Sequence, residues 1–547
     1  MEIKIEYSNG RIESHPVTEA LTEINVRPAP KDACVTATVQ IPLVDVFACW
    51  HSALTPGLTN RIPWVDRISC GAQMNYPFYA LVSRNGRVKA AFSSTDIIDD
   101  CEITFAINQE KCTGELTFLI AVSPETQPFN ILLDLNSRPL TDALKTWRSK
   151  LDLPQLAYPA GAYEPVYCTW YVVHGEVNQA FVEETCPIAK ELGFGTLIVD
   201  DGWCYDENKR VSPKTIVNWY ESVGDWNVSA VKFPQFREHV KRVQALGMNY
   251  LLWVAPHLFG RHSKMLEAYK GHTLPDYVEG YYKMDVNTAE TDVLVGKLRS
   301  LAKEYALDGL KIDFLDIVPP NAHHPNARNT YRFTEKVCGG LKSDNPNALI
   351  EFRQSYATPA MLPWGTQFRA GDAPFDWRLN FGRLVEIRLN LGNLGPVHAD
   401  PAYWAPGELP ENVSRHLMAM LVGVPMLSMD LRTLTETEKR IIRHYIDFYN
   451  QHRQMINHGE WSVLFAQAEI AAAIAENETE RLVILADGNA LADALGSTHK
   501  NTWVMNLSDK TLAIATAQAF AADCLPAPNG TIPPGGCGFV SVSTRTR

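Results

Sequence analysis

Between residues 156 and 455, short apolar runs of strand length alternate with longer segments of helical pattern. This alternation is typical of βα units, whose strands form a parallel sheet. The runs lie at residues 167–173, 196–200, 250–255, 309–315, 349–353, 367–371, 395–399 and 424–429. Eight parallel strands in a segment of this length predict a (β/α)8 TIM barrel, which typically takes about 250 residues.

Helical signals support the alternation at three places, residues 178–192, 288–305 and 436–450. Thr435 stands directly before the last of these segments, and Glu438 follows it by three residues. A Thr followed three residues later by a Glu is the pattern of a capping box, which begins a helix. The segment is therefore expected to form a helix that starts just after Thr435.

The segments on either side of the barrel have a β pattern. Residues 1–155 contain alternating runs separated by Gly, Pro, Asn and Asp, and predict an N-terminal β-sandwich. Alternation returns in residues 456–547 and predicts a small C-terminal β domain. The predicted fold class is thus α/β, with a TIM barrel at residues 156–455 between two β domains. Three domains also agree with the 547-residue length.

Composition excludes several classes of protein. Lys and Arg number 50 against 62 Asp and Glu, and the net charge of −12 argues against nucleic acid as a partner. No apolar stretch approaches the length of a membrane span, and the first residues alternate rather than forming a secretory signal. The 11 cysteines have neither pairing rhythm nor metal spacing. We therefore expect a cytoplasmic protein with reduced thiols and without membrane contact.

The ends of the predicted strands carry the residues from which an active site can be built. In TIM barrels, catalytic side chains lie at the carboxyl ends of the strands. The residues found there are Trp170 and Tyr171 in the first run, Asp200 and Asp201 in the second, Trp253 in the third, Lys311 and Asp313 in the fourth, and Arg369, Asp372 and Asp376 at or after the sixth. Several carboxylates, two cations and several aromatic rings are thus expected to face one cavity.

This set of residues suits a sugar. Carboxylates accept hydrogen bonds from vicinal hydroxyls, cations donate to hydroxyl oxygens, and aromatic rings stack on the apolar face of a pyranose. Two carboxylates on opposite sides of the anomeric carbon can divide glycoside hydrolysis between a nucleophile and a general acid. A single Asp after a strand is also a common helix cap, and a single Trp usually packs in a core. Lys311 and Asp313, two residues apart on one strand, point to the same face, where their burial without function would be costly.

Several motifs in order along the barrel resemble those of the melibiase-type α-galactosidases of glycoside hydrolase family 36. The resemblance is strongest from about residue 167 to 453. The motifs that carry it are Cys168-Thr169-Trp170-Tyr171, Val199-Asp200-Asp201-Gly202-Trp203, Leu252-Trp253-Val254-Ala255-Pro256, Lys311-Ile312-Asp313, the pair Asp372 and Asp376, and Gly423-Val424-Pro425-Met426-Leu427. The order of a sandwich, a barrel and a small β domain resembles the compact members of that family.

The resemblance implies a retaining exo-α-glycosidase, most simply an α-galactosidase, that acts on an oligosaccharide or glycoside without cofactor or metal. It implies these roles: Asp313 as nucleophile, Asp372 as acid/base with Asp376 as its rival, Asp200 and Asp201 on the far hydroxyls, Lys311 on a neighbouring hydroxyl, Arg369 on the hydroxyl next to the anomeric carbon, and Trp170, Tyr171 and Trp253 as pocket walls. In some members a Trp from the sandwich reaches the site, and Trp64 is the candidate here. Large members often associate, so a homo-oligomer is possible.

One departure from the family pattern leaves the substrate open. The family's loop after the fifth strand is rich in Cys, Gly and Ser, whereas this chain has Arg353 and Gln354 there. Arg353 could contact an anionic sugar, so the same barrel could act on a different α-glycoside. It could also perform transglycosylation. A third possibility is an inactive barrel that only binds carbohydrate, against which intact Asp313 and Asp372 argue.

Overall fold

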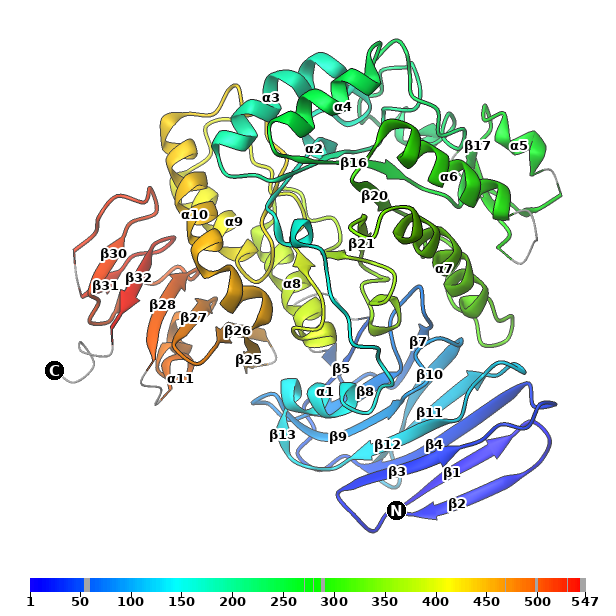
Figure 1. Ribbon diagram of the computed structural model, residues 1–547. Coiled ribbons are helices and arrows are strands. Elements are labelled where there is room, and N and C mark those ends of the chain that lie inside the picture. The colour runs from blue at the N-terminus through cyan, green and yellow to red at the C-terminus, as the bar shows by residue number, and fades with distance from the viewer. Residues whose placement is uncertain are drawn as a thin grey trace.

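The computed structural model describes residues 1–53, 60–269, 271–278, 280–286, 291–467, 469–496, 500–528 and 530–541. Figure 1 shows a central barrel of strands and surrounding helices, with the N-terminal strands in blue beneath it and the C-terminal strands in orange and red at its side. The α/β fold class is the predicted one: a TIM barrel flanked by an N-terminal β-sandwich and a small C-terminal β domain.

The N-terminal region folds into two antiparallel sheets. One has the order β2-β1-β4-β11-β10-β7, and the other β3-β12-β9-β8-β5-β6 with β13 paired to β9. Their bounds are β1 Glu2–Tyr7, β2 Ile12–Pro16, β3 Leu21–Val26, β4 Cys34–Pro42, β5 Ala48–His51, β6 Asn60–Arg61, β7 Val65–Cys70, β8 Phe78–Val82, β9 Arg87–Ser94, β10 Cys101–Asn108, β11 Thr113–Ala121, β12 Phe129–Asp134 and β13 Arg138–Pro139. Alternating residues such as Ile3, Ile5 and Tyr7 are buried between the sheets, which explains the period of two in the sequence.

The central region forms a parallel sheet of eight strands in the order β23-β22-β21-β20-β16-β15-β14-β24. The strands are β14 Val166–Cys168, β15 Thr196–Val199, β16 Asn249–Val254, β20 Gly309–Ile312, β21 Leu349–Arg353, β22 Gln367–Arg369, β23 Val397–His398 and β24 Met426–Leu427. A parallel bridge between His398 and Val424 joins the two ends of this sheet. Each of the eight predicted runs thus contributes one strand of the barrel.

Helices cover the outside of the barrel (Figure 1). Their bounds are α3 Gln179–Glu191, α4 Phe236–Ala245, α6 Thr291–Tyr305, α7 Ala327–Asp344, α8 Trp377–Leu391, α9 Pro410–Met420 and α10 Glu436–His458. The capping box of α10 is present, because Thr435 and Glu438 each accept the other's backbone N–H. The predicted helix at 288–305 is α6, and residues 288–290 lie outside the described part of the chain.

The first barrel strand is shorter than predicted. The run 167–173 was expected to be a strand, but β14 ends at Cys168 and Trp170–Val173 forms the short helix α2. The backbone N–H groups of Tyr171 and Val172 both donate to Ser428 Oγ, at 3.0 and 3.2 Å. This hydroxyl satisfies amides that a helix start leaves unpaired, and it comes from the opposite end of the barrel sequence, so local pattern could not reveal it.

The C-terminal region contains a six-stranded sheet in the order β25-β26-β27-β28-β32-β30 and the pair β29-β31. The strands are β25 Glu460–Ala466, β26 Glu469–Glu476, β27 Glu480–Leu485, β28 Asn501–Asn506, β29 Leu512–Ala513, β30 Gln518–Phe520, β31 Thr531–Ile532 and β32 Cys537–Val540. Helix α10 ends at His458, just before β25, and so passes the predicted boundary at 455/456. The domain boundaries themselves stay predictions.

The sandwich is tied to the barrel by a loop between β9 and β10. Asp100 accepts hydrogen bonds from the backbone N–H groups of Asn326 and Ala327, at 3.0 and 2.9 Å, and thereby caps α7. Its neighbour Asp99 binds the guanidinium of Arg328 with both carboxylate oxygens, each at 2.6 Å. These contacts hold the start of a barrel helix against the sandwich.

Two further observations concern the whole chain. Within the described ranges, no helix combines the length and the apolar character that a membrane crossing requires. All 11 cysteines are free.

Candidate active site

A cavity of about 240 Å³ lies at the carboxyl ends of the barrel strands. Its lining consists of Trp170, Asp200, Asp201, Tyr220, Trp253, Lys311, Asp313, Phe314, Arg353, Arg369, Asp372 and Arg383. Nine of the twelve residues for which the sequence predicts a role in the site lie there, and they come from segments more than 200 positions apart. Parallel strands bring them together because their carboxyl ends all meet at one end of the barrel.

The carboxylate of Asp313 accepts hydrogen bonds from three groups around it. Trp253 Nε1 donates to Asp313 Oδ2 at 2.9 Å, and the backbone N–H of Phe314 donates to Oδ1 at 2.8 Å. The guanidinium of Arg353 also contacts Oδ1. Burial favours the neutral acid, but the charges of Arg353, Lys311 and Arg369 outweigh it and hold the pKa of Asp313 well below its ordinary range. Asp313 is therefore ionised at neutral pH.

The backbone directly after Asp313 is strained. Phe314 has φ of +59°, a left-handed conformation that residues with a side chain seldom adopt. This turn directs the Phe314 amide back onto the Asp313 carboxylate. Strain of this kind collects at functional sites, where the surrounding structure enforces it.

Lys311 and Asp200 form a buried ion pair. Lys311 Nζ lies 2.7 Å from Asp200 Oδ2 and 4.0 Å from Glu351 Oε1. Burial opposes the charge on Lys311, yet the Asp200 carboxylate outweighs it and raises the pKa of the ammonium. The lysine therefore carries its charge on the barrel axis, between the second and fifth strands.

Asp201 has a different environment from its neighbour. Trp219 Nε1 donates to Asp201 Oδ2 at 2.6 Å, and the hydroxyl of Tyr205 lies 3.3 Å from the same oxygen. The other oxygen, Oδ1, is buried and has no hydrogen-bond donor among the described residues. Burial raises the pKa of Asp201 to about 6. This free oxygen is available to a hydroxyl of a ligand in the cavity.

Arg369 connects three carboxylates. Its Nη1 and Nη2 atoms both lie 3.1 Å from Asp372 Oδ1, its Nε lies 3.3 Å from Glu351 Oε1, and it also contacts Asp400. Arg369 itself is buried, while the Asp372 side chain is 58 % exposed at the cavity mouth. Burial favours neutral Asp372, but the charges of Arg369 and Lys311 outweigh it and lower its pKa.

Asp376, the rival of Asp372, has a structural contact. Its Oδ1 accepts hydrogen bonds from the backbone N–H groups of Arg378 and Leu379, both at 3.0 Å, and so caps α8. Asp376 does not line the described cavity.

The aromatic residues divide between the cavity and its support. Trp170 and Trp253 line the cavity, and the ring of Trp253 stacks on Tyr220 at 6.3 Å between centroids. Tyr171 was predicted as a wall, but it is absent from the described lining, and its hydroxyl donates to Asp400 Oδ2 at 2.8 Å.

Of the two residues in the unusual loop after the fifth strand, one lines the cavity and the other does not. Arg353 lines the cavity and is paired with Asp313 and Asp316, the latter at 3.3 Å. Gln354 does not line it: its side-chain Oε1 accepts from Gly371 N at 3.0 Å, and its Nε2 donates to Glu386 at 3.2 Å. Gln354 borders a neighbouring cavity instead.

Trp64 lies outside the cavity. Its side chain is 65 % exposed on the sandwich, directly before β7, and it is absent from the described lining. Within one chain, the structure therefore does not bring Trp64 to the barrel residues.

Sequence reasoning missed five residues at or behind the cavity: Tyr220, Phe314, Glu351, Arg383 and Asp400. Glu351 and Asp400 could have been found, because one lies within the fifth predicted strand and the other directly follows the seventh. Tyr220 lies in a long loop and Arg383 lies within a helix. A search of the residues at the strand ends could therefore not find them.

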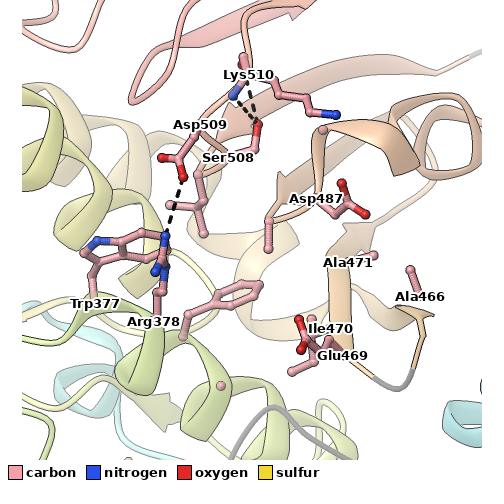
Figure 2. Close-up of a pocket in the computed structure, with 15 residues that line it drawn as sticks. Trp377, Arg378, Ala466, Glu469, Ile470, Ala471, Asp487, Ser508, Asp509 and Lys510 are labelled. Atoms are coloured by element: carbon pink, nitrogen blue, oxygen red, sulfur yellow. Dashed lines mark hydrogen bonds and ion pairs between the residues drawn. The ribbon is translucent and has the colours of Figure 1, made fainter.

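A larger cavity of about 560 Å³ lies between the first turns of α8 and the C-terminal sheet. Figure 2 shows Arg378 on the barrel side, beside Trp377, pointing toward Asp509 of the C-terminal region. Arg378 Nη2 lies 3.7 Å from Asp509 Oδ2 across it. None of the described residues at the strand ends lines this cavity, so it is separate from the candidate site.

One group of described side chains has the proximity that a metal ion requires, and it lies in the sandwich. It consists of Cys49, His51 and Asp66. His51 Nε2 lies 3.2 Å from Asp66 Oδ2, and burial raises the pKa of the Cys49 thiol to about 11. A protonated thiol is a poor metal ligand, and an imidazole–carboxylate pair explains the other two residues.

Comparison with known proteins gives relatives of one kind. The Melibiase family model matches residues 160–306. The chain is 23% identical to alpha-galactosidase AgaA of Geobacillus stearothermophilus over 80% of its own length and 66% of the relative's. It is 24% identical to alpha-galactosidase 1 of Pediococcus pentosaceus over 53% of its length and 41% of the relative's. The chain thus spans less than two thirds of these relatives.

Solved structures share the fold. A variant of the same Geobacillus AgaA, in complex with 1-deoxygalactonojirimycin, superimposes with a TM-score of 0.66 at 16% identity, covering 98% of this chain and 88% of that one. TtGalA from Thermus thermophilus, in complex with p-nitrophenyl α-D-galactopyranoside, superimposes with a TM-score of 0.55 at 15% identity, covering 79% and 90%.

The residues matched by the family model, 160–306, include the motif Val199-Asp200-Asp201. The comparisons confirm that the chain resembles the melibiase-type α-galactosidases of glycoside hydrolase family 36.

Proposed function

We propose that this chain is a retaining exo-α-galactosidase that releases a terminal α-galactosyl unit through a covalent glycosyl-enzyme. The observation that carries the proposal is the joint position of Asp313 and Asp372 at one small cavity, with Asp313 held ionised by three cations. A retaining glycosidase needs a carboxylate nucleophile on one side of the anomeric carbon and a proton donor on the other.

In the first step, an Asp313 oxygen attacks the anomeric carbon while the bond to the glycosidic oxygen breaks. Trp253 and the Phe314 amide orient the carboxylate through hydrogen bonds of 2.9 and 2.8 Å. The electron pair of the broken bond goes to the leaving oxygen, which takes a proton from Asp372. In the second step, Asp372 takes a proton from water, the water attacks the anomeric carbon, and Asp313 leaves.

Asp372 must be protonated to act as the acid, although Arg369 lowers its pKa in the ligand-free site. Its side chain is largely exposed there, and a bound glycoside would cover it. Loss of water favours the neutral form of a carboxyl group, so binding itself shifts Asp372 toward the acid form. Arg369 then keeps the second step possible, because it stabilises the carboxylate that must act as base.

The remaining polar groups suit the hydroxyls of the galactosyl unit. The free Oδ1 of Asp201 and the ion pair of Asp200 and Lys311 are buried in the wall of the cavity, where they would bind hydroxyls of the non-reducing galactosyl unit. Support also comes from the relatives: structures of Geobacillus AgaA variants are described in complex with raffinose and with stachyose. Both identities are near 16%, so substrate choice in this chain rests on the experiment below.

The test is a proton-NMR time course with p-nitrophenyl α-D-galactopyranoside, with the Asp313→Asn protein as the control for contaminating activity. We expect α-galactose to appear before β-galactose, because two inversions retain the configuration. Release of β-galactose first would contradict the covalent intermediate. Release from another α-glycoside alone would contradict the galactosyl assignment, and calorimetric sugar binding without any release would favour the inactive carbohydrate-binding protein.

A further inference from the structure

A second cavity, of about 340 Å³, lies where the sandwich meets the barrel. Asn75 and Tyr76 of the sandwich form one side, and Gln354, Arg383 and Glu386 of the barrel form the other. Arg383 also lines the candidate active site, and it is the one described residue common to both linings. The two cavities therefore adjoin at the Arg383 side chain.

Arg383 differs from the other cations of the site in its pairing. Lys311, Arg353 and Arg369 each contact a carboxylate. Among the described residues, no carboxylate lies within ion-pair distance of the Arg383 guanidinium, and its buried Nε has no hydrogen-bond acceptor. A partly buried guanidinium without an anion is unfavourable, unless a ligand supplies the anion.

The position of Arg383 beside Asp372 indicates which part of a bound substrate Arg383 would contact. A Cβ atom on Gly371 would lie 1.8 Å from Arg383 Nη1, so the guanidinium packs directly against the backbone that precedes Asp372. Asp372 is the proposed proton donor to the glycosidic oxygen. Beyond that oxygen lies the aglycone, which therefore extends toward Arg383 and the second cavity.

The rest of the second cavity contains one carboxyl group among its described lining residues, that of Glu386. Gln354 Nε2 donates a hydrogen bond to this group at 3.2 Å. Burial raises the pKa of Glu386 to about 8, although the nearby charge of Arg383 acts to lower it, so this carboxyl group is mostly neutral at pH 7. At pH 7 Glu386 therefore cancels little of the positive charge of Arg383.

We infer that Arg383 binds an anionic group, a carboxylate or a phosphate, on the aglycone of the substrate. This inference rests on the proposed function, and it specifies which kind of aglycone the enzyme would prefer. It also moves the predicted contact for an anionic substrate from Arg353 to Arg383, because Asp313 and Asp316 already neutralise Arg353. A guanidinium without such partners can form bidentate hydrogen bonds to either anion.

Two matched substrate pairs test the inference by kcat/KM. Melibionate and melibiitol differ by a carboxylate in place of a hydroxymethyl group, and α-galactosylglycerol phosphate differs from α-galactosylglycerol by its phosphate. We expect the protein to prefer the anion of at least one pair by about ten- to a hundredfold, the range for a charge-assisted hydrogen bond. The pair that shows the preference identifies the anion.

Arg383→Ala should bring the ratio of kcat/KM between the anionic and the neutral substrate close to one, whereas Arg383→Lys should keep part of the preference. The matched control is Arg378→Ala, which removes an exposed arginine from the same helix. Equal kcat/KM within both pairs for the unaltered protein would overturn the inference, even if Arg383→Ala failed to fold. Failure of the proposed function would show differently, as no release of galactose from any of the four substrates.

Discussion

At the scale of single residues, Asp313 gives the sharpest prediction. Asp313→Ala should abolish turnover of p-nitrophenyl α-galactoside, because no other described carboxylate contacts both Trp253 Nε1 and the Phe314 amide. Azide should restore part of the cleavage and yield β-galactosyl azide, since it attacks from the side that Asp313 occupied. The measurement is release of p-nitrophenol with and without azide. Substantial activity of the variant without azide would exclude Asp313 as the nucleophile.

A second pair of variants tests whether Asp372 or Asp376 is the acid/base. Asp372→Asn should lose at least about 100-fold in kcat/KM on melibiose, because general acid catalysis typically contributes 10²–10⁴-fold. The loss should be much smaller for an aryl galactoside whose leaving group needs no proton. Asp376→Asn should retain activity on both substrates, since its carboxylate caps α8. The reverse result would assign the acid/base role to Asp376.

At the scale of elements, the contact between the sandwich and α7 should contribute to stability. Asp100 accepts three backbone N–H groups from the segment that begins α7, and loss of a helix cap costs about 0.5–2 kcal/mol. Asp100→Ala should therefore lower the thermal midpoint, while Glu110→Ala, at an exposed loop position, should leave it unchanged. Calorimetry measures both. Equal midpoints would mean that the sandwich docks without this cap.

Some barrel strands are shorter than the apolar runs from which they were predicted. The runs at 395–399 and 424–429 contain strands of only two residues, β23 and β24. The buried residues around them serve the core equally well in extended or irregular backbone. Hydrophobic periodicity therefore locates a strand, but hydrogen bonding to its neighbours decides where it ends.

At the scale of the whole molecule, buried carboxyl groups should make stability fall as pH rises from 7 to 8. Burial raises the pKa of Glu386 to about 8, against about 4.3 in an unfolded chain, so the folded state keeps a proton that the unfolded state has lost. Stability then decreases by about 1.4 kcal/mol per pH unit from this group while it remains protonated. The buried histidines His257, His398 and His416 have pKa values lowered to about 4 in the folded state, against about 6.5 in an unfolded chain, so above pH 7 they are mostly neutral in both states.

Glu386→Gln removes this titration and should flatten the decline. The measurement is the midpoint of urea unfolding for both proteins at several pH values between 7 and 8. We expect the variant to gain stability relative to the unaltered protein as pH rises. Parallel curves would show that Glu386 does not hold its proton in the folded state.

The local sequence pattern was enough to predict the number and order of the barrel strands and the polar residues at their ends. Both depend on local pattern: apolar runs form buried strands, and residues such as Asp200, Lys311 and Asp313 follow or end them. The contact of Tyr171 with Asp400, the pairing of Arg353 with Asp313, and the position of Arg383 between two cavities were decided only in the tertiary structure. Each joins residues from different strands, loops or helices, and the direction of such a side chain depends on packing between elements, which no local pattern encodes.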